Sequence, residues 1–386
     1  MIDAIVLGND HTNTLGVVQA LGSKGLITDA YVWGVRRGLV KASKFANNVY
    51  GYETPEQCIE KICCINPDIL NKPLPIIACS DTAALLLERM RTIIPSYFVY
   101  AAMDGKWSIE AFQDKNIQVK VASEAGLCVP ESIVVDKSWD YSQLSFAGPY
   151  LVKPLVSLKG AKSDIQKCSC HADLRNNIEK LFQKYDGSDV KMLIQQYIRH
   201  DYEISLLGVA TQNGKCIIPA IENKLTQFPL NVGLECRAEI EPFEDSELKR
   251  AICKFVQMSG YKGLFSIEMM HSPQHDRFFF TEMNLRNDGA NSFILQAGAN
   301  LPFMYYADMK NIEIECDISI KKGKYIWEMH HLQSAKANAI SWHEWAKDIC
   351  RADGFLLFTK HDRKPFLRQL FLLVSSALRI KKIETY

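Results

Sequence analysis

The stretch Leu264-Phe-Ser-Ile-Glu-Met-Met-His-Ser-Pro-Gln-His-Asp-Arg-Phe-Phe-Phe-Thr-Glu-Met-Asn-Leu-Arg286 contains the clearest structural pattern in the sequence. Two largely apolar runs flank a short polar segment, which is typical of a β-hairpin. Reflection through the centre of the turn places Glu268 opposite Glu282 on the neighbouring strand. Side chains alternate between the two faces of a strand, so we expect Glu282, Asn284 and Arg286 to share one face.

Two carboxylates and an amide oxygen on one strand face predict a site for a hard cation. The carboxylates of Glu268 and Glu282 would repel each other without a counter-charge, and oxygen ligands such as these and Asn284 suit Mg²⁺. Arg286 beside them could hold a phosphate or a developing acyl phosphate. The alternative is an exposed polar strand face without a ligand, and the spacing alone leaves it open.

The first hundred residues alternate strand and helix patterns. Short apolar runs at residues 4–8, 30–33 and 75–79 are typical of buried parallel strands, and helical spacing follows the first and the third. We therefore expect a doubly wound α/β domain over residues 1–110.

Polar segments directly follow two of these strands, namely residues 8–13 and Ser80-Asp81. Ligands of doubly wound sheets bind at the carboxyl ends of the strands, so both segments should border a pocket. The fingerprint G-x-G-x-x-G is absent after the first strand, which disfavours a nicotinamide cofactor and an oxidoreductase.

The composition is that of a globular protein without a charge imbalance. The chain has 386 residues, and its 45 Lys and Arg against 44 Asp and Glu provide no general attraction to nucleic acid. The length predicts two or three domains. No apolar run is long enough to span a bilayer and the first residues lack a signal-peptide pattern, so we expect a cytoplasmic protein with reduced cysteines.

Several further motifs occur in the order found in ATP-grasp enzymes. Glu268 followed by Glu282-x-Asn284-x-Arg286 resembles the magnesium-binding signature of that superfamily. Asp114-Lys115 resembles the superfamily's entry helix and first lysine, and Tyr150-Leu-Val-Lys153-Pro154 resembles its phosphate-contacting strand. Ser157-Leu-Lys-Gly160-Ala-Lys162-Ser resembles its phosphate-covering loop. Leu193-Ile-Gln195-Gln-Tyr-Ile198 resembles its adenine hinge, and Glu203 resembles its ribose-binding carboxylate. The resemblance covers roughly residues 1–310.

The resemblance implies ATP and Mg²⁺ as cofactors, with Mn²⁺ as a substitute. It assigns nucleotide binding to Lys115, Lys153, Gly160, Lys162, Gln195, Ile198 and Glu203, the metal to Glu268, Glu282 and Asn284, and catalysis to Arg286 and Lys224. Lys224 lies where many members have a further phosphate-contacting cation.

The implied reaction activates a carboxylate with ATP as an acyl phosphate, which an amine then captures. The layout is most similar to the D-aspartate-ligase-like and carbamoyl-phosphate-synthase-like group, in which relatives add amino acids to cell-wall or surface-glycan precursors. The implied partners are therefore a small carboxylate and an amine, with a lipid-linked or nucleotide-linked glycan precursor as one candidate. A kinase or carboxylase of the same fold, a non-catalytic ATP-binding module and a homo-oligomer remain open.

The same resemblance divides the chain into four regions of mixed α/β and α+β structure. A doubly wound pre-ATP-grasp domain over residues 1–110 precedes a two-part ATP-grasp fold. That fold comprises a lid and nucleotide hinge over 111–205 and a catalytic, metal-binding region over 206–315. A C-terminal extension occupies 316–386.

The tail over residues 364–382 combines an apolar stripe near helical spacing with flanking basic residues. It is too short and too basic to span a bilayer. It is expected either to lie in the plane of an anionic membrane surface or to pack as a helix on the catalytic domain.

Overall fold

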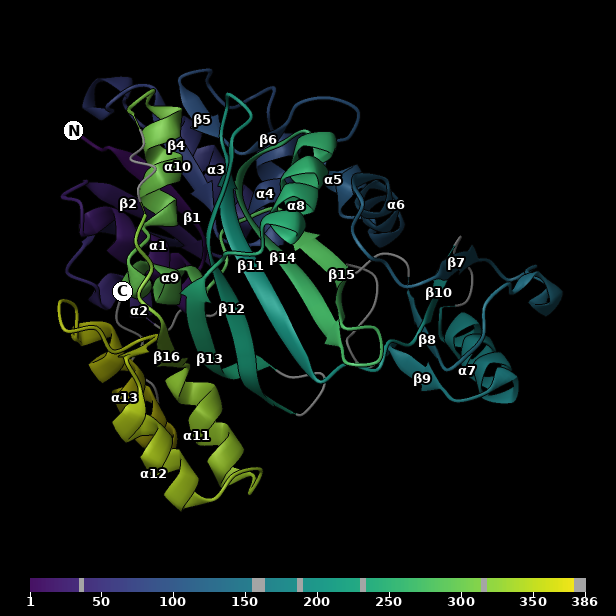
Figure 1. The fold of residues 1–386 in the computed structure, drawn as a ribbon. Coiled ribbons are helices and arrows are strands. Elements are labelled where there is room, and N and C mark those ends of the chain that lie inside the picture. Colours follow the sequence, from purple (N-terminus) through teal and green to yellow (C-terminus); the bar gives the residue numbers. More distant parts are fainter. Residues whose placement is uncertain (35–37, 155–163, 186–189, 230–233, 314–317, 378–386) are drawn as a thin grey trace.

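The computed structural model describes residues 1–34, 38–154, 164–185, 190–229, 234–313 and 318–377. Three β-sheets form its scaffold, with five, four and eight strands. Figure 1 shows the four-stranded sheet projecting from one side of a body that contains the other two sheets. The expected mixed α/β architecture is confirmed.

The N-terminal sheet is parallel and has the strand order β3-β2-β1-β4-β5. Its strands are β1 (Ala4–Asn9), β2 (Thr28–Trp33), β3 (Ala46–Tyr52), β4 (Leu74–Ala78) and β5 (Phe98–Tyr100). The connecting helices are α1 (Thr12–Gly22), α2 (Leu39–Ala42), α3 (Pro55–Cys63) and α4 (Asp81–Arg89). The strand order reverses at β1, so the connections cover both faces, as the sequence predicts.

Strand β3 has no strand pattern in the sequence. Its residues Ala-Asn-Asn-Val-Tyr-Gly-Tyr include two asparagines and a glycine, which are depleted in strands, and most are partly exposed at the sheet edge. Tertiary contacts hold it in place: the ring centroids of Tyr50 and Tyr52 lie 4.9 and 6.3 Å from that of Tyr31 on β2.

Gly8 permits a close approach of chain segments at the end of β1. A Cβ atom at this position would lie 2.4 Å from Thr14 Oγ1 and 2.8 Å from Cys79 Cβ. Thr14 Oγ1 also donates a hydrogen bond of 2.7 Å to the carbonyl oxygen of Asn9. The start of α1 and the end of β4 therefore converge on the carboxyl end of β1 because residue 8 has no side chain.

The four-stranded sheet is antiparallel, with the order β7-β10-β8-β9. Its strands are β7 (Ser132–Val135), β8 (Tyr150–Pro154), β9 (Gln166–Cys168) and β10 (Met192–Gln196), and α7 (His171–Lys184) packs on it. Among the described residues its hydrophobic core, which includes Tyr150, Ile178 and Met192, is separate from that of the main body.

The eight-stranded sheet has the order β15-β14-β11-β12-β13-β16-β17, and β6 (Ala102–Met103) pairs with β14. The other strands are β11 (Tyr202–Ala210), β12 (Cys216–Phe228), β13 (Leu234–Pro242), β14 (Tyr261–Ser272), β15 (Arg277–Asn284), β16 (Gly323–Ile326) and β17 (Gly354–Phe355). The predicted hairpin is confirmed, because β14 pairs with β15 and Glu268 lies opposite Glu282.

Helices cover one face of this sheet and leave the other to polar side chains. They are α5 (Ile109–Phe112), α6 (Lys115–Ala125), α8 (Ser246–Ser259), α9 (Asn291–Ala297) and α10 (Leu301–Met309). Figure 1 shows α8 lying along the sheet, and the rings of Phe112 and Phe280 contact Phe255 with centroids 6.0 and 5.0 Å apart.

Gln118 fastens helix α6 to the hairpin. Its amide nitrogen donates to the carbonyl oxygen of Met283 at 2.9 Å, and its amide oxygen accepts from the Met283 N–H at 2.8 Å. This buried pair of hydrogen bonds fixes the start of α6, and hence Lys115, beside β15.

The C-terminal part contains α11 (Glu328–Lys336), α12 (Trp342–Arg351) and α13 (Lys364–Ala377). Asp362 is buried, and it ties this part to the N-terminal domain by accepting hydrogen bonds from Gln19 Nε2, Ser43 Oγ and the Lys44 N–H. None of the described helices has the length and apolar character needed to cross a membrane.

Candidate active site

A row of polar side chains crosses the face of the eight-stranded sheet opposite its helices. The strand register places Glu282, Glu268, Ser205 and Glu222 side by side on β15, β14, β11 and β12. Glu268 and Ser205 each lie between buried apolar residues of the core, which is the alternation a half-covered sheet requires.

Lys224 bridges two carboxylates of this face. Its Nζ lies 3.2 Å from Glu268 Oε2 and 3.5 Å from Glu203 Oε2. Burial acts to lower the pKa of Lys224, but Glu268 and Glu203 outweigh it and hold the pKa above its ordinary value. Lys224 is therefore a fixed positive charge at neutral pH.

The two hairpin carboxylates differ in their electrostatics. Lys224 lowers the pKa of Glu268, but burial together with Glu282 raises it more, so the net shift is upward. Burial raises the pKa of Glu282, but Lys115 and Lys153 outweigh it, so the net shift is downward. Lys115 Nζ lies 3.1 Å from Glu282 Oε2. Without the lysines, two neighbouring carboxylates could not both stay ionised.

Lys153 is a buried cation at the carboxyl end of β8. Only 8% of the residue is exposed, and its Nζ donates a hydrogen bond of 3.1 Å to the neutral Gln195 Oε1. Burial lowers the pKa of Lys153 to about 8, with a further lowering from Lys115. Among the described residues no carboxylate lies within hydrogen-bond distance of this buried ammonium, which makes its burial costly, and an anionic ligand would relieve that cost.

The remaining described residues assigned to the nucleotide lie on strand β10, just after it, and near the start of β11. Gln195 belongs to the central strand β10, and Ile198 is buried just after that strand. Glu203 is the second residue of β11 and accepts a hydrogen bond of 2.7 Å from Gln227 Nε2. Gly160 and Lys162 lie outside the described residues.

Arg286 joins the hairpin to the N-terminal domain. Its guanidinium nitrogens lie 3.3 Å from Asn284 Oδ1, 2.8 Å from Asp288 Oδ2 and 3.3 Å from Asp81 Oδ1. Burial acts to lower the pKa of Arg286, but Asp288 and Asp81 hold it above its ordinary value. Arg286 is thus a permanent charge where two parts of the chain meet.

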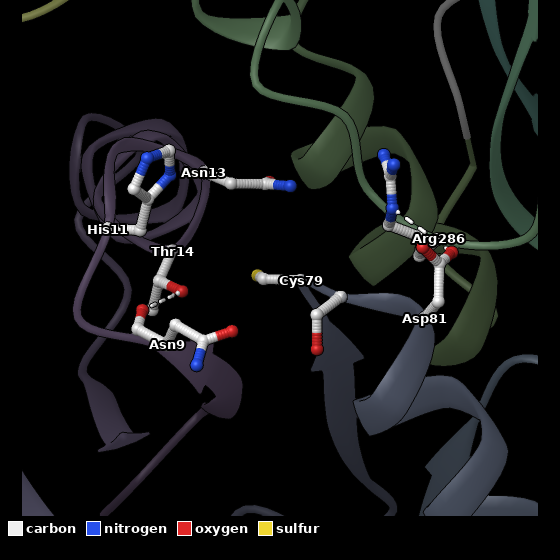
Figure 2. A pocket seen from close by; sticks show the side chains of 8 residues that line it. Asn9, His11, Asn13, Thr14, Cys79, Asp81 and Arg286 are labelled. Carbon is white, nitrogen blue, oxygen red and sulfur yellow. Dashed lines mark hydrogen bonds and ion pairs between the residues drawn. The ribbon is translucent and has the colours of Figure 1, made fainter. Parts of the chain in front are cut away.

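A cavity of about 270 Å³ lies beside Arg286 at the carboxyl edge of the parallel sheet. It is lined by Asn9, His11, Asn13, Thr14, Cys79, Ser80, Asp81 and Arg286. Figure 2 shows Asn9, His11, Asn13 and Thr14 on one side, Asp81 and Arg286 on the other, and Cys79 between them. The pocket expected at the ends of the first and third predicted strands is confirmed.

No protein-family model matches the chain. One curated relative is the formate-dependent phosphoribosylglycinamide formyltransferase of Prochlorococcus marinus (strain NATL2A), with 24% identity over 243 residues. The alignment covers 62% of this chain and 59% of that protein, so the chain spans about three fifths of the length of the curated relatives it matches.

Two solved structures share the architecture over most of the chain. N5-carboxyaminoimidazole synthetase from Staphylococcus aureus, complexed with ADP, has a TM-score of 0.64 at 14% identity and covers 88% of this chain and 87% of its own. L-amino acid ligase from Bacillus licheniformis has a TM-score of 0.58 at 12% identity and covers 83% and 80%. The chain has the ATP-grasp fold.

Within this ATP-grasp fold, most residues singled out from the sequence converge on one region. The hairpin residues Glu268, Glu282 and Asn284 lie beside the lysines at 115 and 224 and beside Arg286. In the described part of the chain, no group of three or more His, Cys, Asp or Glu residues could hold a metal ion. The predicted metal set contains only two such residues, together with the Asn284 amide.

Two features of this region escape the sequence patterns. Asp288 is buried against Arg286 and accepts a hydrogen bond of 3.1 Å from Ser266 Oγ. Its place two residues after Arg286, which continues the alternation of the hairpin, is the signal that could have identified it. The second feature is a pair of buried carboxyls, Glu222 and Glu235. Burial raises the pKa of each, that of Glu235 to about 7, and only the packing of β12 beside β13 brings them together.

Proposed function

We propose that the chain is an ATP- and Mg²⁺-dependent carboxylate–amine ligase that works through an acyl phosphate. The supporting observation is the convergence of fixed cations with the Glu268–Glu282 pair on one sheet face beside a polar cavity. Such an arrangement serves phosphoryl transfer, where charge neutralisation and positioning provide most of the rate enhancement.

The donor set of the hairpin fits Mg²⁺. Glu268, Glu282 and Asn284 offer hard oxygen atoms, and Mn²⁺ accepts the same ligands. Each carboxylate has a lysine within 3.2 Å, and these lysines compensate the charge of the two neighbouring carboxylates. When bound, the ion would neutralise phosphate charge and polarise the transferred phosphoryl group.

The nucleotide assignments rest on burial and charge. Lys153 would donate to the phosphates, because an anion there removes the cost of a buried ammonium, and Lys115 starts the neighbouring helix. Glu203 would accept hydrogen bonds from the ribose hydroxyls. Gln195 and Ile198 would border the adenine, and Gly160 and Lys162 would cover the phosphates.

The proposed reaction balances without a protein nucleophile. A carboxylate oxygen of the substrate attacks the γ-phosphorus of ATP, the bond to the bridging oxygen breaks, and ADP leaves. Arg286 and Lys224 stabilise the charge on the transferred group. An amine then attacks the acyl carbon, inorganic phosphate leaves, and the amine loses its proton to solvent.

The deciding measurement is ADP release by the full chain with ATP and Mg²⁺ across carboxylates, each with and without an amine. A ligase gives release that depends on both substrates, together with an amide product detected by mass spectrometry. Release without an amine, with a phosphorylated product, would instead indicate a kinase. Bicarbonate dependence would indicate a carboxylase, and no release with any carboxylate would indicate a non-catalytic module.

We further propose that the amine belongs to a cell-wall or surface-glycan precursor at an anionic membrane. Leu367, Leu370, Phe371 and Val374 form a stripe on α13, with exposed fractions between 45% and 57%. Arg368 lies beside it, and the basic residues after 377 fall outside the described part of the chain. The helix α13 also contacts α2, which belongs to the N-terminal parallel-sheet domain and not to the catalytic region on which a packed tail was expected.

Vesicle co-sedimentation tests this membrane proposal. The full chain should pellet with phosphatidylglycerol vesicles at low salt but not with phosphatidylcholine vesicles, and Leu370→Glu should abolish pelleting. A concentration-dependent dimer without vesicle binding would instead assign the stripe to a second copy of the chain.

A further inference from the structure

The cavity beside Arg286 is lined by residues of the N-terminal domain and by Arg286, which follows the β14–β15 hairpin. Its floor lies where β1 and β4 end, and its wall includes an arginine that also contacts the Asn284 amide of the hairpin. A molecule in the cavity would therefore lie next to the place where the proposed ligase transfers its phosphoryl group.

The size and lining of the cavity restrict its ligand. Its volume of about 270 Å³ is below the range of roughly 300 to 1,000 Å³ that is usual for larger ligands. The lining side chains are mainly amides, hydroxyls and charged groups. Burial raises the pKa of the Cys79 thiol to about 12, so it stays protonated. The cavity thus suits a small polar molecule and offers no thiolate nucleophile.

Hydrogen bonds hold the Asn13 side chain of the cavity in place. Asn13 Nδ2 donates a hydrogen bond of 2.9 Å to the carbonyl oxygen of Asn287, and Asn287 Nδ2 donates back to Asn13 Oδ1. Asn287 is in turn held by Asn291 Nδ2 at 2.7 Å from its Oδ1. This network fixes one wall of the cavity before any ligand enters.

The charges of the lining residues favour a zwitterionic ligand over a phosphate. Arg286 is the only arginine or lysine among the residues that line the described cavity, and it already contacts two carboxylates, Asp81 in the lining and Asp288 behind it. A phosphate dianion would need surplus cations that this lining lacks, although the curated relatives are named for a phosphoribosyl compound. A ligand with one negative and one positive group matches the lining.

We propose that this cavity binds a small zwitterionic amino acid, with its carboxylate toward Arg286 and its ammonium toward Asp81. The inference rests on the ligase function proposed above and assigns the amino acid the role of the activated carboxylate. Asp81 is 46% exposed at the side chain, and it contacts Arg286 through Oδ1, so the same carboxylate can accept from a ligand.

Isothermal titration calorimetry on the full chain with Mg²⁺ and AMP-PNP tests the proposal. The probes are the standard amino acids and their D-enantiomers, followed by the carboxylic acid that lacks the amine of the best binder, and by ribose 5-phosphate. We expect the best amino acid to bind at least about tenfold more tightly than its deaminated analogue and than ribose 5-phosphate. Tighter binding of the phosphate compound, equal binding of the deaminated acid, or no binding of any amino acid would overturn the assignment.

Asp81→Asn provides the matching variant. It should remove the preference for the amino acid over its deaminated analogue, whereas Asp81→Glu should retain part of it. Glu56→Gln is the control, because Glu56 is also a first-turn carboxylate in the same domain, is exposed and does not line the cavity. Unchanged preference in Asp81→Asn would overturn the proposal.

Nucleotide binding separates this inference from the proposed function. In one outcome, MgATP binds and ADP release depends on a carboxylate, but Asp81→Asn prefers the amino acid over its deaminated analogue as strongly as wild type does. The ligase function then stands and the amino-acid site is wrong. If amino acids bind through Asp81 without any ADP release, the cavity assignment stands and the ligase function is wrong.

Discussion

Lys115 Nζ lies 3.1 Å from Glu282 Oε2, which joins the first turn of helix α6 to the edge strand of the eight-stranded sheet. The pair keeps Glu282 ionised against the effect of burial, since Lys115 lowers the pKa of this carboxyl. An ionised carboxylate is what a magnesium ligand requires before the ion arrives.

Glu282→Gln preserves shape and removes the charge. We expect Mg²⁺-dependent turnover to fall by roughly 100-fold or more, because a metal ligand is lost, with only a modest change in the free energy of unfolding. Glu239→Gln is the matched control, since Glu239 is also a partly buried carboxylate that pairs with a lysine, at 3.6 Å from Lys322. Near-normal turnover in Glu282→Gln would place the metal elsewhere.

Lys153→Met should stabilise the ligand-free protein and abolish its stabilisation by MgATP. The pKa of Lys153 is lowered from 10.5 to about 8, so at pH 7 burial of the charge costs on the order of 3 kcal/mol. The variant should therefore have a higher Tm than wild type at pH 7 without nucleotide. Lys191→Met, which changes an exposed lysine next to β10, serves as the control.

The same shift predicts a pH dependence with a definite sign. Between about pH 8 and 10.5 the unfolded state binds a proton at Lys153 that the folded state has lost. The contribution of Lys153 to the free energy of unfolding thus rises with pH in this window and is constant below it. The stability difference between Lys153→Met and wild type should shrink from pH 7.5 to 10, and a constant difference would contradict the shift.

Glu203→Gln should weaken ATP binding more than it slows chemistry. Glu203 faces Lys224 and Gln227, and the proposal gives it the ribose hydroxyls. We expect KM for ATP to rise about tenfold with kcat within a few fold, and the preference for ATP over 2′-deoxy-ATP and 3′-deoxy-ATP to shrink. Glu241→Gln should leave both constants unchanged, since Glu241 likewise has one side-chain amide partner and one lysine partner, Asn223 and Lys322.

Asp362→Ala should destabilise the chain by roughly 2 to 4 kcal/mol, because it leaves buried donors on the N-terminal domain without an acceptor. Chemical denaturation would measure this loss. Asp353→Ala should lower the free energy of unfolding by less, since Asp353 is exposed and accepts a hydrogen bond from the Lys324 N–H. Activity per folded molecule should be unchanged, and a selective loss of activity would indicate a role in the site.

The sequence alone determined the local elements and their class. The alternation of the hairpin specified that Glu268 faces Glu282, because strand periodicity depends only on neighbouring residues. Buried apolar runs followed by helical spacing specified the parallel sheet and the edge at which its pocket opens. Edge strand β3 escaped this reasoning, since contacts with Tyr31 rather than its own residues hold it as a strand.

Only the tertiary structure decided which charges meet. Lys115 faces Glu282, Lys224 bridges Glu268 and Glu203, and Arg286 reaches Asp81, although these partners lie far apart in the sequence. Electrostatic energy depends on distance and burial, and both are set by the packing of helices and sheets. The charge balance of the cavity, on which the proposed substrate class rests, therefore exists only in the folded chain.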